Sequence, residues 1–418
     1  MTSRRDFLAT SAGLAGTALL SPAVHAAGSD ILKVGLIGCG GRGTGAATQA
    51  LNADPNVKLV AMGDMFPDRL KSSLNQLRGE VGEKVDVKPE ACFAGWDAYK
   101  KVLDAGIDVV LLTTPPGFRP LHLKAAVEAG KHVFCEKPMA VDAPGVRSVI
   151  ETCREARRKN LAVVAGFCYR YEKAKRETMK RVHQGEVGDI VALQCTYNAG
   201  ALWNRPRQPG WDDMTAQLRN WPYYTWLSGD HIVEQACHSI DKMAWAMRDE
   251  PPAKANGTGG RQSRIEEEFG HIFDHHVVVY EWKSGIKLFH ACRQQKGCKN
   301  DVSDYVMGTL GTADVMRHRI SGKREWAHRK VKGDRAEDMY QNEHDELFAS
   351  LRKGSPINDG DWMAQSTLMA IMGRMSTYTG KEITWEMAMN SKEDLTPKYE
   401  FGTLPTPPVA RPGITKFI

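Results

Sequence analysis

The stretch ILKVGLIGCGGRGTGAATQAL, residues 31–51, decides the fold of the first part of this chain. It opens with a short Leu, Val and Ile run that is typical of a buried strand, crosses a glycine cluster and enters a helix-forming segment. Gly38, Gly40 and Gly43 fit the pattern G-x-G-x-x-G directly after the strand. The first glycine permits a tight turn, the second lets the backbone approach a pyrophosphate, and the third lets helix and strand pack closely. The stretch therefore predicts a dinucleotide site at a helix N-terminus.

The next buried run, VKLVAMGD, ends in an acid at Asp64, about twenty residues beyond Gly43. A carboxylate at the end of the second strand can accept hydrogen bonds from both ribose hydroxyls, and it would repel a 2′-phosphate. The predicted cofactor is therefore NAD in preference to NADP. Arg42, inside the glycine motif, is expected to contact the same cofactor.

Strand and helix patterns continue to alternate through the first part of the chain. Two further buried runs, IDVVLLTTPP (107–116) and KHVFCEKP (131–138), are separated by a segment of helical character. This alternation predicts an α/β domain of the Rossmann type over residues 32–160, with helices on both faces of a parallel sheet. Ligands of such sheets lie beyond the carboxyl ends of the strands. Those ends carry the remaining predicted cofactor contacts, which are Thr114, Pro115, Glu136 and Lys137.

The pattern changes in the second part of the chain. Runs such as DIVALQCTYNAG (189–200) and HHVVVYEWKSGIKLFHACRQ (275–294) alternate apolar and polar residues in the manner of antiparallel strands. We therefore expect an α+β domain with a large, mostly antiparallel open sheet over residues 161–390. Residues 391–418 are Pro-rich and are expected to run extended over the surface.

Length and composition agree with two globular domains. The chain has 418 residues, more than one hydrophobic core usually organises, with 42% hydrophobic and 25% charged residues. The formal net charge of +6 is small, and the densest basic run, 317–335, has few aromatic residues, so no nucleic-acid partner is predicted.

The N-terminus has the pattern of a twin-arginine export signal over residues 1–27. Arg4 and Arg5 are followed by Phe7 and Leu8, a mildly apolar stretch and a small-residue cleavage site at 24–26. The alternatives are a disordered basic leader or an anchor helix. Because this route carries proteins that have already folded, often with a cofactor bound, we expect a periplasmic or otherwise exported cofactor enzyme without stable membrane insertion.

Cysteine and histidine usage gives no sign of a disulfide framework or a metal site. The 9 cysteines form an odd set without a C-x-x-C motif and are expected to be buried free thiols. His271, His275 and His276 are close in sequence, but neighbouring residues of a strand point to opposite faces and no clear third ligand completes a set. No metal is predicted.

Taken together, GCGGRG, Asp64, TTPP, GKHVFCEKPMA and ACHSID resemble the Gfo/Idh/MocA family of oxidoreductases over residues 32–390. The resemblance implies an NAD(P)-dependent enzyme that transfers a hydride between a nicotinamide and a secondary hydroxyl of a sugar, glycoside or polyol. It places Lys137 beside the nicotinamide and the substrate hydroxyl and makes the bond before Pro138 a candidate cis peptide. It also implies a homo-oligomer, a dimer or tetramer, formed through the exposed face of the second sheet.

The stretch DHIVEQACHSID, residues 230–241, supplies the acid–base candidates. It is expected to form a helix with Glu234 one turn before His238, where the resemblance implies D-x-x-x-H facing the nicotinamide. An imidazole titrates near neutrality, so His238 is predicted to be the general base. Lys137 is predicted to stabilise the developing alkoxide, with Glu234 or Asp241 as polar support. His231 is an alternative base.

Substrate contacts are predicted at Lys137, Arg170, His238 and Asp241. Arg170 ends a strand near the domain junction, where a structural ion pair is the alternative to a substrate contact. The aromatic segment 201–226 either stacks on sugar rings or packs as a loop.

Three functions remain open from the sequence. The first is an exported oxidoreductase whose tightly bound cofactor is reduced by one substrate and reoxidised by another. The second is an NAD-dependent glycosidase that works through transient oxidation, which the presence of Lys137 disfavours. The third is a non-catalytic nucleotide-binding protein, which has no need of Lys137 and His238.

Overall fold

A computed structural model describes residues 30–329 and 338–418 of the chain. The predicted export signal, residues 1–27, and the end of the basic run 317–335 therefore lie outside the described residues. Within the described ranges, no helix is long and apolar enough to cross a membrane.

The first domain is built on a six-stranded parallel sheet of order β3-β2-β1-β4-β5-β6. Its strands are β1 (Leu32–Ile37), β2 (Val57–Asp64), β3 (Cys92–Ala94), β4 (Val109–Leu112), β5 (His132–Cys135) and β6 (Val163–Ala165). Its helices are α1 (Gly41–Ala53), α2 (Pro67–Val81), α3 (Ala98–Leu103), α4 (Arg119–Glu128) and α5 (Ala143–Arg158). The strand order reverses between β1 and β4, which is where such sheets bind their ligands. The predicted Rossmann-type fold is confirmed.

The parallel sheet extends past residue 160, where the first domain was predicted to end. β6 pairs with β5 in parallel register, and its three residues are buried. The boundary was placed too early because a run of three apolar residues gives too short a signal to assign to one sheet or the other.

The second domain is built on a nine-stranded sheet of order β14-β13-β12-β11-β7-β10-β9-β8-β15. Its strands are β7 (Ile190–Ala199), β8 (Lys254–Gly260), β9 (His275–Glu281), β10 (Lys287–Gln294), β11 (Asp301–Gly308), β12 (Gly311–Asp314), β13 (Arg319–Gly322), β14 (Trp326–Ala327) and β15 (Ile383–Thr384). All neighbouring pairs are antiparallel except β7 with β10. The predicted mostly antiparallel sheet is confirmed.

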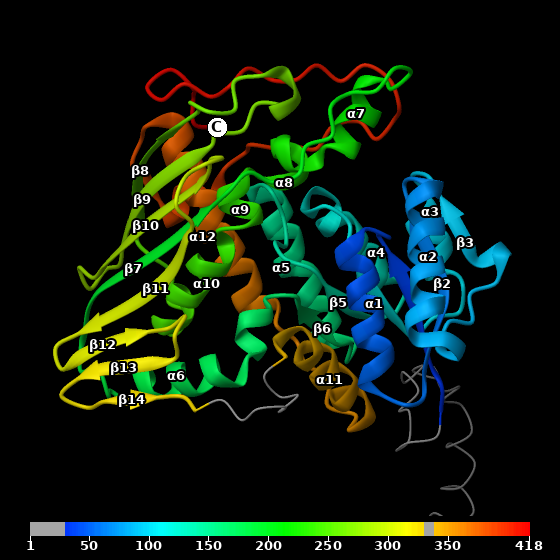
Figure 1. Ribbon diagram of the computed structural model, residues 1–418, viewed down its shortest axis with the longest axis horizontal. Helices are drawn as coiled ribbons and strands as arrows, with labels where there is room; N and C mark the ends of the chain where they lie inside the picture. The colour runs from blue at the N-terminus through cyan, green and yellow to red at the C-terminus, as the bar shows by residue number, and fades with distance from the viewer. Residues whose placement is uncertain (1–29, 330–337) are drawn as a thin grey trace, which may run out of the picture.

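One face of this sheet is covered and the other is open. Helix α12 (Gly360–Thr379) is buried along most of its length and lies between the sheet and α5 (Figure 1). The open face exposes large apolar side chains, at Val277 and Phe289. The remaining helices are α6 (Lys173–His183), α7 (Asp213–Arg219), α8 (Thr225–Ser228), α9 (His231–Glu234), α10 (Cys237–Ala246), α11 (Met339–Arg352) and α13 (Trp385–Asn390).

Two late segments return to the first domain. Helix α11 packs against α1. The C-terminal segment runs along one end of the molecule past α7 and α8 (Figure 1), and its Tyr399 stacks on Trp96 with ring centroids 5.7 Å apart. The chain therefore crosses between the domains more than once, which brings residues distant in sequence to one cavity.

Candidate active site

A cavity of about 920 Å³ opens where the strand order of the parallel sheet reverses. Its first wall comes from the loops after β1, β2, β4 and β5, and its second from the α9–α10 region and the aromatic segment 201–226. It is lined by all the predicted cofactor contacts: Gly38, Gly40, Arg42, Gly43, Asp64, Thr114, Pro115, Glu136 and Lys137.

The glycine motif forms a cradle of the shape that a pyrophosphate requires. Gly38 has a φ of +100°, and a side chain there would lie 2.6 Å from the backbone nitrogen of Thr114. A side chain at Gly43 would lie 1.9 Å from the carbonyl oxygen of Gly38. At Gly40 and Gly41, by contrast, a Cβ would meet nothing within 4 Å. The first amides of α1 therefore face open space at the positive end of the helix, which fits a dinucleotide.

Asp64 closes the ribose end of the cradle. One carboxylate oxygen accepts a hydrogen bond from the backbone nitrogen of Cys39 at 2.6 Å, and the other accepts one from Phe66 at 2.9 Å. Burial raises the pKa of this carboxyl group, against the two backbone donors that lower it. The two amides fix the orientation of a carboxylate that lies in the cavity at the end of β2.

Arg42 crosses from the glycine motif to two carboxylates. It pairs with Glu136 after β5 and, at 2.9 Å, with Glu343 of α11, while its guanidinium lies 4.8 Å from the ring centroid of Tyr340. Glu343 and Tyr340 are about three hundred residues away in the sequence, and no local pattern indicated them. Arg42 thus anchors the cradle to α11 and lines the cavity beside Tyr340.

Lys137 lies on the border of the two domains. Its Nζ donates to the Glu234 carbonyl oxygen and, at 2.9 Å, to Glu234 Oε1. Burial lowers its pKa, but the Glu234 carboxylate and neighbouring groups outweigh this, so the pKa is raised and Lys137 remains an ammonium group. Two of its three N–H bonds are engaged by Glu234, and the third is left for a ligand. The bond before Pro138 is cis, as the resemblance implied.

The predicted single helix over residues 230–241 is wrong. α9 ends at Glu234, Gln235 and Ala236 form a break, and α10 starts at Cys237. The break directs Glu234 towards Lys137 rather than His238, so the carboxylate positions the lysine and not the imidazole.

His238 lines the cavity with one ring nitrogen buried behind it. Nδ1 is buried and has no partner among the described residues, which leaves Nε2 as the nitrogen that a ligand can reach. Burial, together with Lys137, Lys242 and Arg42, holds the pKa of His238 well below its usual value. The imidazole is therefore neutral and can accept a proton. The ring of Tyr169 supports it edge-on, with centroids 5.2 Å apart.

Arg170 and Asp241, both predicted to contact substrate, are not among the cavity-lining residues. Arg170 Nη2 lies 2.8 Å from Asp241 and 2.6 Å from Asp249, and both Arg170 and Asp241 are buried. The two side chains form an ion pair with each other, because a buried charge without a partner is energetically costly. The structure thus shows the ion pair that the sequence left open, and it places these two residues behind the active site.

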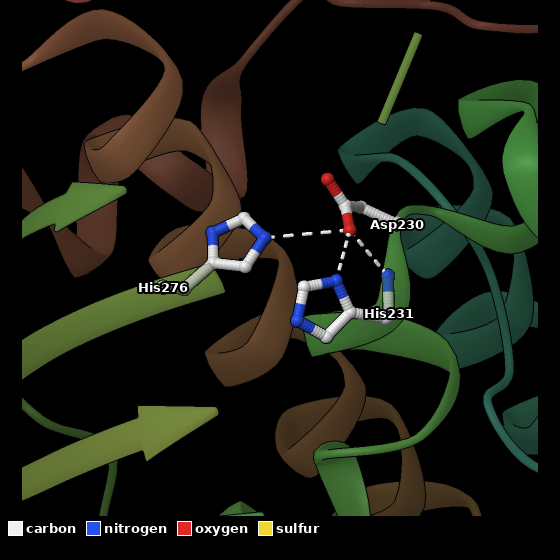
Figure 2. Close-up of side chains that lie close together, drawn as sticks. All are labelled: Asp230, His231 and His276. Carbon is white, nitrogen blue, oxygen red and sulfur yellow. Dashed lines mark hydrogen bonds and ion pairs between the residues drawn. The ribbon is translucent and has the colours of Figure 1, made fainter. Parts of the chain in front are cut away.

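The alternative base, His231, belongs to a buried cluster with Asp230 and His276 (Figure 2). His231 Nδ1 lies 2.8 Å from Asp230 Oδ1, and His276 Nε2 lies 3.3 Å from the same oxygen. The other oxygen accepts from the Phe273 backbone at 2.9 Å and from the Tyr378 hydroxyl at 2.5 Å. Because protein donors already engage both carboxylate oxygens, we assign the cluster a structural role that ties α9 to β9 and α12.

The aromatic segment 201–226 divides between the two roles considered for it. Trp203 and Trp221 line the cavity, and Trp203 is 44% exposed. Tyr223, Tyr224 and Trp226 are buried in a cluster with Phe118. The segment therefore packs one side into the protein and presents two indole rings to the cavity.

Sequence reasoning missed several cavity residues, because they lie on elements that gave no chemical signal. Tyr197 lies near the end of β7, where burial raises its pKa to about 12. Trp96 and Tyr399 stack on each other in the cavity lining, and Tyr399 comes from the tail to which no chemistry was assigned. Gln235 also lines the cavity. It lies inside the motif DHIVEQACHSID, but an amide does not titrate and gave no sign of acid–base chemistry.

The sequence of this chain is similar to those of known oxidoreductases. Residues 32–165 match the GFO_IDH_MocA family, described as "Oxidoreductase family, NAD-binding Rossmann fold". Inositol 2-dehydrogenase 3 of Saccharopolyspora erythraea is 28% identical over 285 residues, which cover 67% of this chain and 72% of the relative.

Solved structures have the same fold. A probable dehydrogenase from Thermotoga maritima has a TM-score of 0.63 at 21% identity, covering 85% of this chain and 100% of that chain. A levoglucosan dehydrogenase in complex with NADH and levoglucosan has a TM-score of 0.68 at 18% identity, covering 85% and 99%. Residues 32–165 of this chain thus match the Gfo/Idh/MocA family of oxidoreductases, and inositol dehydrogenases are homologues of this protein.

Proposed function

We propose that this protein is an NAD(P)-dependent oxidoreductase that oxidises a secondary hydroxyl of a sugar, glycoside or polyol. The observation that carries the proposal is the meeting of Lys137 and His238 in one cavity with an open glycine cradle. A nucleotide-binding protein without catalysis would have no use for a lysine and an imidazole in these protonation states.

The two side chains divide the acid–base work. When bound, the nicotinamide supplies a hydride acceptor. Neutral His238 takes the hydroxyl proton through Nε2, because its low pKa leaves the ring unprotonated. The Lys137 ammonium group, held by Glu234, donates its remaining N–H to the oxygen on which negative charge develops. Glu234 keeps the lysine charged and correctly placed.

Asp64 supports NAD over NADP. Two backbone amides orient its carboxylate at the ribose end of the cavity, where a 2′-phosphate would meet a negative charge in a buried setting. The fixed orientation makes this repulsion difficult to relieve by rotating the side chain.

A carbohydrate substrate is supported by the cavity wall and by the relatives. Trp203 and Trp221 line the cavity together with polar groups, and indole rings suit the C–H face of a sugar or cyclitol. The named relatives act on inositol and levoglucosan, both cyclic polyhydroxy compounds.

Export, assembly and cofactor retention complete the proposal. The twin-arginine pattern of residues 1–27 supports export, and the described cysteines are all free, as expected for a protein that folds before it leaves the cytoplasm. The exposed apolar side chains Val277 and Phe289 support a homo-oligomer through the open sheet face. Trp96 and Tyr399 support tight cofactor binding.

The test is cofactor reduction by the purified mature protein with a panel that contains myo-inositol, levoglucosan, aldoses and methyl glycosides. We expect net reduction of NAD by at least one of them, and loss of turnover in Lys137→Ala and His238→Ala with nucleotide binding retained. Release of an aglycone without net cofactor reduction would instead indicate the glycosidase. Absence of nicotinamide binding would contradict the proposal.

A further inference from the structure

Gln235 occupies the break between α9 and α10 and lines the same cavity as the Lys137–Glu234 pair and His238. Its backbone follows the last residue of α9 with φ −113° and ψ −52°, and the residue is partly exposed. Neither the acid–base scheme nor the cofactor cradle uses this residue. Its amide is nevertheless held by an extended network.

The network is a chain of hydrogen bonds that starts at a buried arginine. Arg264 Nη2 donates to Gln294 Oε1, and Gln294 Nε2 donates to Gln235 Oε1 at 2.6 Å. Arg264 and Gln294 are 2% and 1% exposed. The backbone of Arg264 is held by Asp274, and its guanidinium lies 5.1 Å from the ring centroid of Tyr223.

This series of hydrogen bonds fixes the direction in which the oxygen and the nitrogen of each side-chain amide point. A guanidinium can only donate, so Gln294 must turn its oxygen to Arg264 and its nitrogen to Gln235. Gln235 must then accept with its oxygen, which leaves its Nε2 for the cavity. Among the described residues, none accepts a hydrogen bond from this nitrogen. The wall beside His238 therefore presents an oriented, neutral N–H donor.

We propose that Gln235 determines substrate specificity by donating a hydrogen bond from Nε2 to a substrate oxygen next to the reacting hydroxyl. Arg264 and Gln294 are positioning residues that hold the amide in this orientation. The inference rests on the proposed function and refines it. The substrate carries two neighbouring oxygens, one that reacts between Lys137 and His238 and one that accepts from Gln235.

An isosteric substitution at residue 294 can reverse the orientation of the Gln235 amide while keeping a side chain of the same shape in the network. In Gln294→Glu the new carboxylate accepts from Arg264 but cannot donate, so Gln235 has to turn its nitrogen inward and its carbonyl oxygen towards the cavity. We expect kcat/KM for the full substrate to fall roughly tenfold to a hundredfold, although residue 294 is not among those that line the cavity. Gln235→Met should lower it by a similar factor.

The discriminating measurement compares each substrate with its monodeoxy derivatives. The probes are myo-inositol, levoglucosan and methyl β-D-glucopyranoside, each with derivatives that lack one oxygen next to the reacting carbon. We expect one deoxy position to lower kcat/KM strongly in the wild type and only slightly in Gln235→Met and Gln294→Glu. Gln76→Met is the control, because its amide bonds Glu80 at 2.8 Å on an exposed part of α2, outside both the cavity lining and the network. Full discrimination in Gln235→Met would overturn the proposal.

A second measurement decides the inference without turnover. In protein labelled with ¹⁵N-glutamine, hydrogen exchange of the side-chain amides is followed, with Gln235→Met and Gln294→Met identifying the two signals. We expect the Gln294 amide to be protected and the Gln235 amide to exchange rapidly. A protected Gln235 amide contradicts the proposed orientation. Failure of every probe as a substrate would count against the proposed function, while the exchange result would still decide how Gln235 is oriented.

Discussion

At the scale of single residues, the active site depends on two protonation states that burial pushes in opposite directions. His238 lies beside cations and is desolvated, so it stays neutral. Lys137 is equally buried, but the Glu234 carboxylate at 2.9 Å keeps it charged. One carboxylate placed on the lysine thus determines which group accepts the proton and which stabilises negative charge.

The low pKa of His238 predicts an unusual pH profile. A base must be unprotonated to act, and the folded protein holds this imidazole below its ordinary value of 6.5. We expect kcat/KM for the oxidation to remain level as pH falls through 6.5 and to decline only at lower pH. The measurement is a pH profile of kcat/KM with a substrate that does not titrate. An acid limb centred at or above the ordinary imidazole value would contradict the assignment.

Glu234 should affect turnover through its contact with Lys137. Glu234→Gln removes the charge that raises the pKa of Lys137, while retaining an oxygen for the hydrogen bond. We expect kcat to fall about tenfold to a hundredfold with little change in nucleotide affinity. Steady-state kinetics together with NADH titration would check this. An equal loss in kcat and in NADH binding would indicate general disruption instead.

Asp64 makes a prediction about cofactor choice. Asp64→Ser removes the charge that opposes a 2′-phosphate, so the ratio of kcat/KM for NAD to that for NADP should fall about tenfold or more. Kinetics with both cofactors would measure it. Asp104→Ser, which changes an exposed acid at the end of α3 outside the cavity lining, serves as the control and should leave the ratio unchanged. A ratio unchanged in Asp64→Ser would remove Asp64 from cofactor selection.

At the scale of elements, the important feature is the interrupted helix between residues 230 and 246. Asp230 starts it with a φ of 77°, a conformation that costs a residue with a side chain about 1–3 kcal/mol. The hydrogen bonds that converge on its carboxylate hold this backbone in place (Figure 2). Around the break after Glu234, three functional side chains, those of Glu234, Gln235 and His238, line one cavity.

Loss of the Asp230 carboxylate should therefore be costly. Asp230→Ala leaves buried donors from His231, Phe273 and Tyr378 without an acceptor, and we expect the free energy of unfolding to fall by at least about 3 kcal/mol. Urea denaturation would measure it. Asp361→Ala, which removes an exposed ion pair with Arg157, should cost less than about 1 kcal/mol. A comparable effect of the two substitutions would contradict the structural role of the cluster.

At the scale of the whole molecule, the cavity belongs to neither domain alone. Lys137 and Glu234 join the domains at the reacting end, and Arg219 pairs with Asp68 at the cofactor end, with both contacts at 2.7 Å. The C-terminal segment adds Tyr399 over Trp96. Cofactor binding is therefore expected to depend on segments outside the Rossmann-type domain.

A substitution at Tyr399 in the C-terminal segment tests whether this segment contributes to cofactor binding. Tyr399→Ala removes stacking on Trp96 and contact with Phe118, so NADH should dissociate about two to ten times faster. Stopped-flow fluorescence of NADH release would show it. Phe289→Ala, on the open face of the second sheet, is a control of similar size and should leave the rate unchanged. Identical rates in wild type and Tyr399→Ala would exclude the tail from cofactor retention.

The sequence by itself determined the features that depend on local pattern. Glycine spacing after an apolar strand, the acid at Asp64 and the strand–helix alternation were sufficient for the Rossmann-type fold and the cradle, because each follows from contacts within a few dozen residues. Period-two alternation was sufficient for the mostly antiparallel sheet. The motif around Lys137 and His238 indicated the two residues that the structure brings into one cavity.

Only the tertiary structure decided how distant polar groups pair. Arg170 and Asp241 are directed at each other, Glu234 at Lys137, and Arg42 at Glu343, across separations that no periodicity encodes. The orientation of Gln235 depends on Arg264 and Gln294 from other strands and loops. Buried charges and amides take whichever partner the fold brings within hydrogen-bonding distance, and that partner depends on the packing of the whole chain.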